Sequence, residues 1–367
     1  MKKIVWLCSS PTPYNGCLFT ALHNRANIDL EVVYRQTYLD SYPWKKTGRE
    51  AYSSRKLSGC LGFDLKLVKQ VLSDKNIVFV LGGWHPSFWF LIFLMSIKAS
   101  KFLVWSDTPN DLHQRGIIKS FVRNFWLKLI FKNCFALLGM GKPCVDRLVS
   151  LGANPSKVFN FPLWIPLKEQ HVKQSRDVEK TIRVVSIGRL VEVKGLDWLI
   201  HAAAQVNAAE PSLCIEYVIC GDGPLRSDLD ELIKREGLTD SFIITGWLEH
   251  EEVYKILDTA DIYVHPAIWE PYGAVILEAM AAGLPILGSD NTMAALDRVE
   301  DGVTGLIHEA GNVGMITEQI LRLAKNSEER KRMGRSSYEL SRKFPVESGV
   351  EEFLRLASID ADMTQII

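Results

Sequence analysis

Two glutamates, Glu270 and Glu278, are separated by seven residues in a segment that follows the apolar run 261–266. The Ala-rich part of this segment predicts a helix that ends at Gly283. Ionised carboxylates accept hydrogen bonds and do not donate them, so this pair suits the hydroxyl groups of a ribose and a sugar. We also expect a phosphate site at the start of the helix, where backbone N–H groups are exposed. These N–H groups belong to Tyr272, Gly273 and Ala274.

Two cations, Arg189 and Lys194, follow the apolar run 182–187, and Gly188 permits a turn between that run and the cations. A guanidinium and an ammonium together can bind a diphosphate and stabilise it as a leaving group. Two more turns follow predicted strands further along the chain. Their candidate binding residues are Gly221, Gly223, Trp247 and Leu248. Because ligands bind at the carboxyl ends of parallel strands, we expect all these residues at one sheet edge.

Both halves of the sequence alternate short β-branched or aromatic runs with helix-length segments, which predicts two α/β domains with parallel sheets. The predicted strands are 4–8, 30–34, 77–81, 102–105, 135–138, 182–187, 215–220, 242–245, 262–265 and 285–287. Predicted helices include 197–206 and 226–236. A polar, proline-containing stretch, 161–180, marks the boundary. We therefore expect domains at 1–165 and 166–345, and a C-terminal helix or tail, 346–367, that packs back on the first domain.

The second half resembles the donor domain of retaining glycosyltransferases of the GT-B fold, family 4 (glycosyl transferases group 1). The motifs GR-x4-KG, GDGP and EPYGAVILEAMAAGLP carry this resemblance, in that order and spacing. It implies two Rossmann-like domains with parallel sheets that face each other across a cleft. It also implies an enzyme that transfers a sugar from a nucleoside diphosphate to an acceptor hydroxyl, with retention of the anomeric configuration.

The resemblance further implies a role for each matching residue of the second half. Arg189 and Lys194 would bind the diphosphate. Glu270 would hold the hydroxyls of the donor sugar, and Glu278 would hold those of the ribose. Tyr272 and Gly273 would offer backbone N–H groups, whereas Trp247 and Leu248 would contact the base. A front-face mechanism, in which an oxygen of the leaving phosphate helps to deprotonate the acceptor, is implied in the same way.

The first half resembles the family in architecture and in a few turns. Gly16 follows the first predicted strand, where relatives usually keep a glycine loop near the donor phosphates. His85 and Asp107 follow two other strands and are candidates for the acceptor side. Many relatives have a histidine near the position of Asp107. We favour Asp107, because an aspartate at a sheet edge can accept a hydrogen bond from an acceptor hydroxyl.

No cofactor or catalytic metal is expected besides the nucleotide-sugar substrate, for which UDP is favoured over GDP. Asp228 and Asp230 lie within a predicted helix, and Asp360 and Asp362 lie in the C-terminal tail. Neither pair directly ends a strand, so Arg189, Lys194 and the helix start are expected to neutralise the departing diphosphate.

Charge is distributed unevenly along the chain, although the formal net charge is zero. Residues 1–165 contain 22 Lys and Arg against 9 Asp and Glu, and the remainder contains 21 against 34. This asymmetry favours an anionic partner for the first half, or attraction between the two halves. Segment 112–132 mixes cations with aromatic residues, which predicts either a membrane-surface helix or a core-packed helix with a basic outer face. Residues 36–58 predict a loop that is either solvated or binds a phosphorylated ligand through its aromatics and cations.

These features favour a cytoplasmic protein, peripheral on the inner face of the membrane, that acts on a lipid-linked or polysaccharide acceptor in cell-envelope glycan, lipopolysaccharide or exopolysaccharide assembly. The seven cysteines form no Cys-x-x-Cys pair, and the chain starts without a signal-peptide pattern. The apolar run 88–97 is too short to span a bilayer and predicts a buried helix. A nucleotide-sugar epimerase of the same fold and a non-catalytic nucleotide-sugar-binding protein are the alternatives. No nucleic-acid-binding signature is found.

Overall fold

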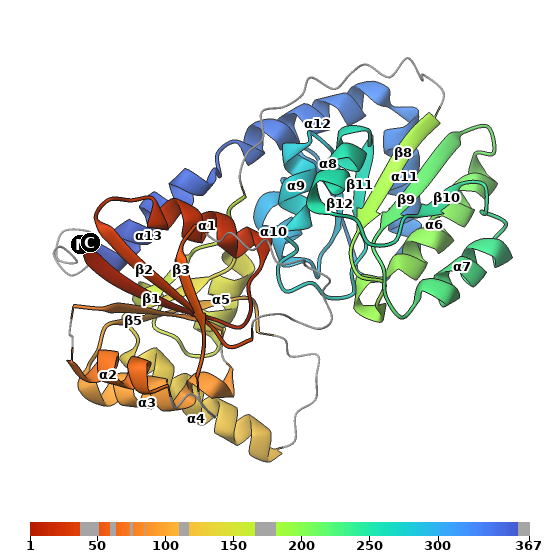
Figure 1. The fold of residues 1–367 in the computed structure, drawn as a ribbon. Helices are drawn as coiled ribbons and strands as arrows, with labels where there is room; N and C mark the ends of the chain where they lie inside the picture. Colours follow the sequence, from red (N-terminus) through yellow and green to blue (C-terminus); the bar gives the residue numbers. More distant parts are fainter. Residues whose placement is uncertain are drawn as a thin grey trace. The chain divides into compact units, whose positions relative to one another are not determined.

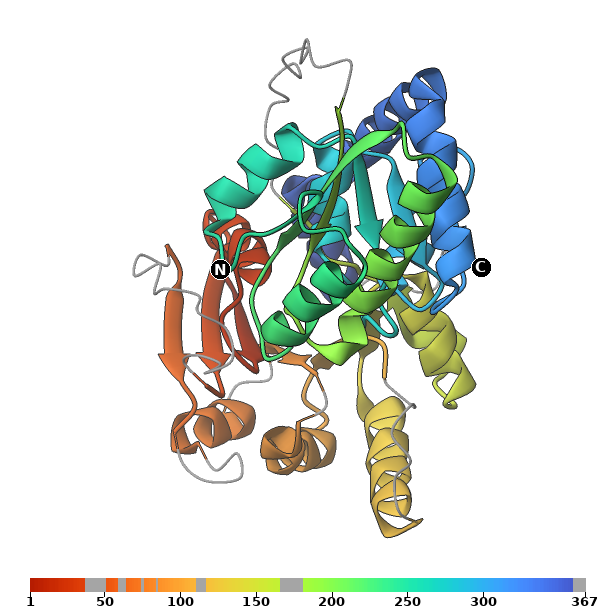
Figure 2. The same cartoon turned by 90° about the vertical axis from the view of Figure 1, so that its right-hand side faces the viewer.

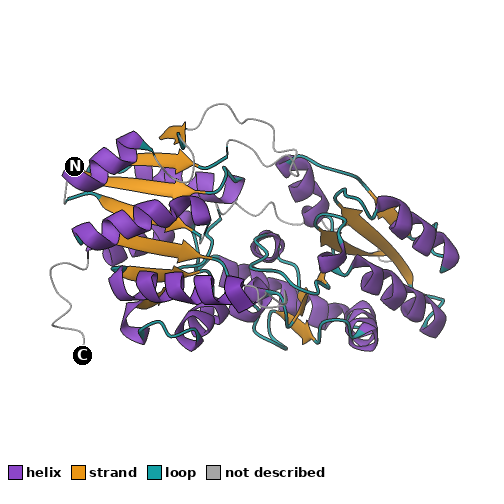
Figure 3. Ribbon diagram, turned by 90° about the horizontal axis from the view of Figure 1, so that it is seen from below, coloured by secondary structure: helices purple, strands orange, loops and turns teal. Residues whose placement is uncertain are grey.

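The computed structural model describes residues 1–36, 51–58, 64–73, 76–83, 85–109, 117–165 and 181–358. The chain divides into two compact units, of which the first comprises Met1–Pro166 and Pro345–Ile367 and the second comprises Leu167–Phe344. Each unit contains one sheet covered by helices (Figures 1 and 3). Every pairing between strands of these two sheets is parallel. The predicted architecture of two parallel-sheet α/β units is therefore confirmed.

The sheet of the first unit has seven strands in the order β3-β2-β1-β4-β5-β6-β7. The strands are β1 (Lys2–Cys8), β2 (Ile28–Tyr34), β3 (Ser53–Lys56), β4 (Val78–Gly82), β5 (Phe102–Ser106), β6 (Ala136–Gly139) and β7 (Val158–Asn160). Apolar side chains on both sides of β1, β4 and β5 are buried, as expected for inner strands of a parallel sheet. Helices on both faces of the sheet provide this cover.

One face of this sheet packs against α2 (Leu65–Ser73), α3 (Trp89–Lys98), α4 (Ile117–Asn133) and α5 (Lys142–Ser150), which share a core with the strands. Figure 2 shows α2, α3 and α4 side by side along this face. The other face packs against α1 (Pro13–His23) and α13 (Val346–Ser358), where the rings of Trp6 and Phe353 lie 4.8 Å apart. The C-terminal helix therefore belongs to the first unit.

The sheet of the second unit has six strands in the order β10-β9-β8-β11-β12-β13. The strands are β8 (Thr181–Ile187), β9 (Cys214–Cys220), β10 (Phe242–Ile244), β11 (Ile262–His265), β12 (Ile286–Ser289) and β13 (Gly305–His308). The helices are α6 (Leu196–Ala209), α7 (Arg226–Arg235), α8 (His250–Asp258), α9 (Val275–Ala281), α10 (Met293–Arg298), α11 (Val313–Lys325) and α12 (Ser327–Ser341). Strands β8 and β11 are adjacent at the centre of the sheet, so their following loops lie at one edge.

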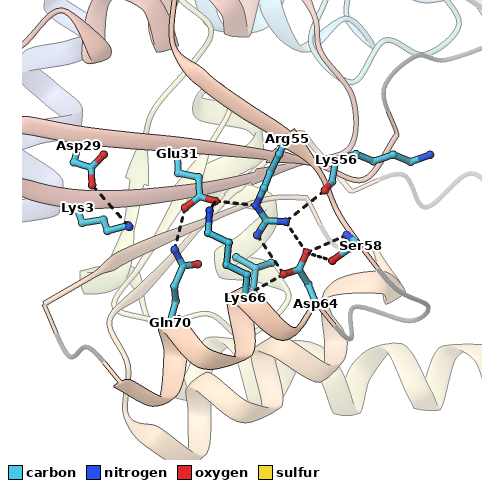
Figure 4. A network of polar contacts seen from close by, with 10 residues as sticks. Lys3, Asp29, Glu31, Arg55, Lys56, Ser58, Asp64, Lys66 and Gln70 are labelled. Carbon is cyan, nitrogen blue, oxygen red and sulfur yellow. Dashed lines mark hydrogen bonds and ion pairs between the residues drawn. The ribbon is translucent and has the colours of Figure 1, made fainter.

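Ten predicted strands correspond to observed ones, but β3, β7 and β13 were not predicted. The prediction of a loop at 36–58 is wrong for residues 53–56, which form β3, and residues 37–50 lie outside the described residues. Strand β3 pairs with β2 at the sheet edge, and Arg55 donates hydrogen bonds to Glu31 at 2.8 Å and to the buried Asp64 at 2.6 Å (Figure 4). The charge of Arg55 is therefore compensated within the protein.

Two further predictions concern helices of the first unit. Helix α3 was expected to be buried, but only one side of it is: Phe93 and Ile97 are 49% and 63% exposed. Gly16 was expected in a loop, but it lies in the first turn of α1, because Thr12 caps that helix and Pro13 begins it. The backbone N–H of Gly16 donates to the carbonyl of Thr12 at 3.0 Å, so it is not available to a phosphate.

Candidate functional site

The loops that follow β8 and β11 are joined by backbone contacts at the edge of the second sheet. The backbone N–H of Ile268 donates to the carbonyl of Val193 at 3.0 Å. Gly195 has φ +58°, and a Cβ at this position would lie 2.6 Å from the carbonyl oxygen of Pro266. The absence of a side chain at Gly195 therefore allows the loop carrying Lys194 to approach the loop carrying Glu270.

Lys194 and Glu270 form an ion pair between these two loops, in which the Lys194 Nζ donates to the Glu270 Oε2. The two side chains are 20% and 11% exposed. The backbone of Glu270 is fixed on both sides, because its N–H donates to Asn291 at 3.0 Å and its carbonyl accepts from Met293 at 3.1 Å. The structure thus brings together two residues that are far apart in the sequence and that were both predicted to act on the donor.

His265 and Tyr263 lie beneath this ion pair on strand β11, and sequence analysis missed both. The Tyr263 hydroxyl lies 3.0 Å from the His265 Nδ1, and the His265 Nε2 lies 3.4 Å from the Glu270 Oε2. Burial lowers the pKa of His265, so its imidazole is neutral at pH 7. The signal that could have found these residues is a pair of polar rings two positions apart on an otherwise apolar strand, which places both on one face.

The carboxyl group of Glu270 is ionised under all ordinary conditions. Burial by itself would raise its pKa, but the positive charge of Lys194 and the contact with His265 outweigh burial and lower the pKa to about 2. A buried carboxylate with a single cation at one oxygen can accept further hydrogen bonds at the other. The role of Glu270 toward the hydroxyl groups of a ligand stays a prediction.

Glu278 lies on helix α9, and its side chain is only 3% exposed. The His250 Nε2 on helix α8 lies 3.4 Å from the Glu278 Oε1 and 3.1 Å from the Tyr254 hydroxyl. His250 was also missed by sequence analysis, although it closely follows Trp247 and Leu248, which are half-buried in the turn after β10. The contact therefore connects the first residue of α8, which follows this turn, to Glu278 on α9.

The segment between Glu270 and α9 is anchored by the side chain of Tyr272. The Tyr272 hydroxyl lies 3.3 Å from the Asp297 Oδ2 and accepts from the Arg298 Nε at 3.5 Å. Gly273 has φ +96°, a conformation that favours glycine. Within the described residues, no acceptor is recorded for the backbone N–H groups of Tyr272, Gly273 and Ala274. Tyr272 and Ala274 are themselves buried, and the binding of a phosphate by these N–H groups stays a prediction.

Gly188, Gly221 and Gly223 occupy the place where the loops after β8 and β9 cross. A Cβ on Gly221 would lie 1.9 Å from the carbonyl oxygen of Gly188, and a Cβ on Gly223 would lie 2.5 Å from that of Leu190. Both obstacles are backbone atoms, which cannot move aside as a flexible side chain can. The crossing keeps the turn with the half-buried Arg189 at the sheet edge.

Gly221→Ala is expected to destabilise the protein strongly, because its Cβ would collide with the Gly188 carbonyl. We expect the free energy of unfolding to fall by about 3 kcal/mol or more, as in other overpacked positions. Gly237→Ala is the matched control, since Gly237 has φ +70° with open space around it and should lose only about 1 kcal/mol. Urea unfolding measures both. Equal losses in the two variants would show that the loops do not cross as described.

The acceptor-side candidates lie in the first unit. His85 caps a short 3-10 turn, where its Nδ1 accepts from the backbone N–H of Ser87 at 3.1 Å, so it has a local structural role. Asp107 is exposed directly after β5. Its role in acceptor binding stays a prediction.

Neither a metal-binding cluster nor a membrane-spanning helix occurs in the described part of the chain. There, no group of three or more His, Cys, Asp or Glu side chains lies close enough to hold a metal ion. Asp228 and Asp230 lie within α7, as the sequence predicted, and Asp360 and Asp362 lie outside the described residues. Among the described helices, none has both the length and the apolar character needed to cross a bilayer.

Known proteins match parts of the chain at the level of sequence. Residues 168–340 match the family model described as glycosyl transferases group 1. An alpha-D-kanosaminyltransferase of Streptomyces kanamyceticus is 34% identical over 155 residues, which are 42% of this chain and 39% of that protein. An amylovoran biosynthesis glycosyltransferase of Erwinia amylovora is 26% identical over 59% of this chain and 53% of that protein. The matched segments thus span about half of these relatives or less.

Solved structures match over nearly the whole chain. Anabaena HepE in complex with UDP superposes with a TM-score of 0.79 and 17% identity, covering 98% of this chain and 100% of that chain. The lipopolysaccharide outer core galactosyltransferase WaaB superposes with a TM-score of 0.75 and 13% identity, covering 97% and 99%. At these identities the likeness establishes the fold. The protein therefore has the GT-B fold of two Rossmann-like units, and its second unit matches the family of glycosyl transferases group 1.

Proposed function

We propose that the protein is a retaining glycosyltransferase of family 4 that moves a sugar from a nucleoside diphosphate to a hydroxyl of a glycan or lipid-linked acceptor. The family match of residues 168–340 and the named transferases among the relatives support this activity. A relative in exopolysaccharide biosynthesis, that of amylovoran, supports an acceptor of the same class. UDP is the proposed nucleotide, and the HepE structure with bound UDP supports this choice.

The observation that carries the proposal is the buried pair of Lys194 and Glu270 at the edge of the second sheet. An ammonium group has three N–H donors, and within the described residues only Glu270 is recorded as an acceptor from Lys194. The two other donors can bind oxygens of a diphosphate while Glu270 keeps the side chain in place. We propose that Lys194 and Arg189 stabilise the diphosphate as it leaves, which is the largest electrostatic demand of the reaction.

The two glutamates have separate proposed roles. Glu270, which is charged and fixed by Lys194, would accept hydrogen bonds from the donor sugar. Glu278, which is buried beside His250, would accept them from the ribose. Trp247 and Leu248 would contact the base, and no metal or other cofactor is proposed. Since Gly16 donates its N–H within α1, the proposed diphosphate site rests on residues of the second unit.

Glu278→Ala is expected to weaken UDP binding by about tenfold, because the ribose would lose a hydrogen-bond acceptor. Isothermal titration with UDP measures the Kd, and Glu251→Ala, which removes an exposed carboxylate of α8, is the control. An unchanged Kd in Glu278→Ala would exclude this residue from the ribose site.

The proposed activity is tested by incubating the protein with UDP-sugars and candidate glycan acceptors. A glycosyltransferase releases UDP and forms a glycosylated acceptor. An epimerase would instead return an altered nucleotide sugar, and a binding protein would leave the donor unchanged. Thermal stabilisation by UDP and GDP, and by their sugars, identifies the donor first, because a ligand that binds only the folded state raises the melting temperature. If no nucleotide or nucleotide sugar stabilises the protein, the proposal is wrong.

A further inference from the structure

Apolar side chains are exposed on neighbouring helices of the first unit. Among the described residues, twelve large apolar side chains are exposed, and seven of these lie on α2, α3 and α4. These seven are Leu65, Leu72, Phe93, Ile97, Phe121, Val122 and Phe125. Phe121 and Phe125 are the most exposed aromatic ones, at 73% and 58%. Isolated exposed apolar residues are normal, but a concentration on adjacent helices indicates an interaction surface.

Helices α3 and α4 have a buried side that fixes which residues face outward. Leu91, Ile92 and Met95 of α3 and Leu127, Ile130 and Phe131 of α4 belong to the core of the first unit. The rings of Trp89 and Trp126 stack at 4.8 Å and join the two helices. Helix α4 is thus core-packed, which agrees with one alternative from the sequence, but its outer side carries Phe121 and Phe125 as well as cations.

Lysines occupy the same exposed side of α4 as these phenylalanines. Phe121, Phe125, Lys128 and Lys132 are all exposed and follow one another at helical spacing, so they form one stripe along the helix. We call this set, together with Phe93 and Ile97 of α3, the α3/α4 face. Aromatic side chains with long flanking cations are typical of a helix that lies in the plane of a membrane interface.

The positive charge of these helices favours an anionic partner for this surface. Helices α2, α3 and α4 contain no Asp or Glu and together contain seven cations. These are Lys66, Lys69, Lys98, Lys119, Arg123, Lys128 and Lys132. Two copies of the α3/α4 face would repel each other, because both carry the same charge. An anionic lipid surface complements the cations and receives the apolar side chains at the same time.

We propose that the α3/α4 face docks the protein peripherally on an anionic membrane. Phe93, Ile97, Phe121 and Phe125 insert at the level of the headgroups, and Lys128 and Lys132 bind the lipid phosphates. This inference does not depend on the sugar-transfer activity, because it rests on a surface of the first unit alone. It also gives a reason for the positive charge of the first half, because the cations of that half do not belong to the proposed donor site.

Sedimentation with lipid vesicles tests this proposal with the full-length protein. Binding is expected to vesicles that contain phosphatidylglycerol and not to vesicles of phosphatidylcholine alone. It should weaken as the salt concentration rises from about 0.1 M to about 1 M, where screening acts within about 3 Å. Binding that is equal for both lipids would overturn the proposal, as would the absence of binding to either.

Two double variants locate the surface. Lys128→Gln with Lys132→Gln is expected to lower the partition coefficient about 25-fold, since each cation near an anionic surface contributes about fivefold. Phe121→Ser with Phe125→Ser is expected to lower it about tenfold. The matched controls are Lys234→Gln with Arg235→Gln on α7 and Ile243→Ser on β10, all at exposed positions of the second unit. Equal loss in the controls would reject the α3/α4 face as the docking surface.

Four measurements separate membrane docking from misfolding, dimerisation and nucleic-acid binding. The variants should melt like the wild type and keep its affinity for UDP, because they lie outside the donor site. If the phenylalanine variant fails to fold, the lysine variant still decides the outcome. Light scattering should give the same mass for wild type and variants without lipid, whereas a dimer lost in the variants would assign the face to a second copy of the chain. Tighter binding to single-stranded nucleic acid than to anionic vesicles would also overturn the proposal.

Discussion

Lys194→Ala is expected to lower kcat by about 10² to 10³-fold, which is the loss seen when a donor that stabilises developing negative charge is removed. The Nζ of Lys194 is fixed against Glu270 in a largely buried position, where charge interactions are stronger than in water. The diphosphate gains negative charge as the sugar departs, so the missing cation affects the transition state more than the bound donor. Single-turnover release of UDP measures this step directly.

Two controls accompany this variant. Lys255→Ala removes an exposed lysine from α8 in the same unit and should keep full activity. Lys194→Arg keeps the charge but changes its shape, so we expect activity between that of Lys194→Ala and wild type. If Lys194→Ala turns over at the wild-type rate, Lys194 does not stabilise the leaving group.

Glu270→Gln is expected to have the second-largest effect on activity, with a loss in kcat of about 10²-fold. The amide keeps the size of the side chain but removes the charge that pairs with Lys194. Because a buried cation then lacks its partner, the free energy of unfolding should also fall, by about 3 kcal/mol at pH 7. Activity assays and urea unfolding measure the two losses separately.

The pH dependence of stability gives an independent test of this ion pair. The folded-state pKa of Glu270 is about 2, below its ordinary value of 4.5. The stability that ionised Glu270 contributes is therefore present above pH 4.5 and lost as the pH falls toward 2. The difference in unfolding free energy between wild type and Glu270→Gln should shrink over the same range. A difference that is independent of pH would mean that Glu270 and Lys194 are not paired.

Ten strands of the two sheets could be predicted, mainly because inner parallel strands are apolar on both faces. Strand β3 could not, since its sequence Ser-Ser-Arg-Lys is polar and it lies at a sheet edge. Its Arg55 compensates Glu31 and Asp64 (Figure 4), of which Glu31 is distant in sequence. The composition of this segment does not show that its cations pair with carboxylates of the protein, so it also allowed a ligand-binding role for them.

The candidate site likewise contains residues that local sequence motifs point to and residues that only tertiary contacts reveal. Motif spacing named Lys194, Glu270 and Glu278 as candidates, and the structure brings Lys194 and Glu270 into contact. Motif spacing missed His265 and His250, because each contacts its glutamate through the fold and not through a motif. Which side of α4 faces outward also depended on tertiary packing, and the sequence left two alternatives.

A crystal structure of the protein with UDP tests the central claim most directly. The account predicts a diphosphate oxygen within hydrogen-bonding distance of the Lys194 Nζ, with the ribose hydroxyls at the Glu278 carboxylate. A nucleotide bound elsewhere, with Lys194 contacting only Glu270, would contradict it.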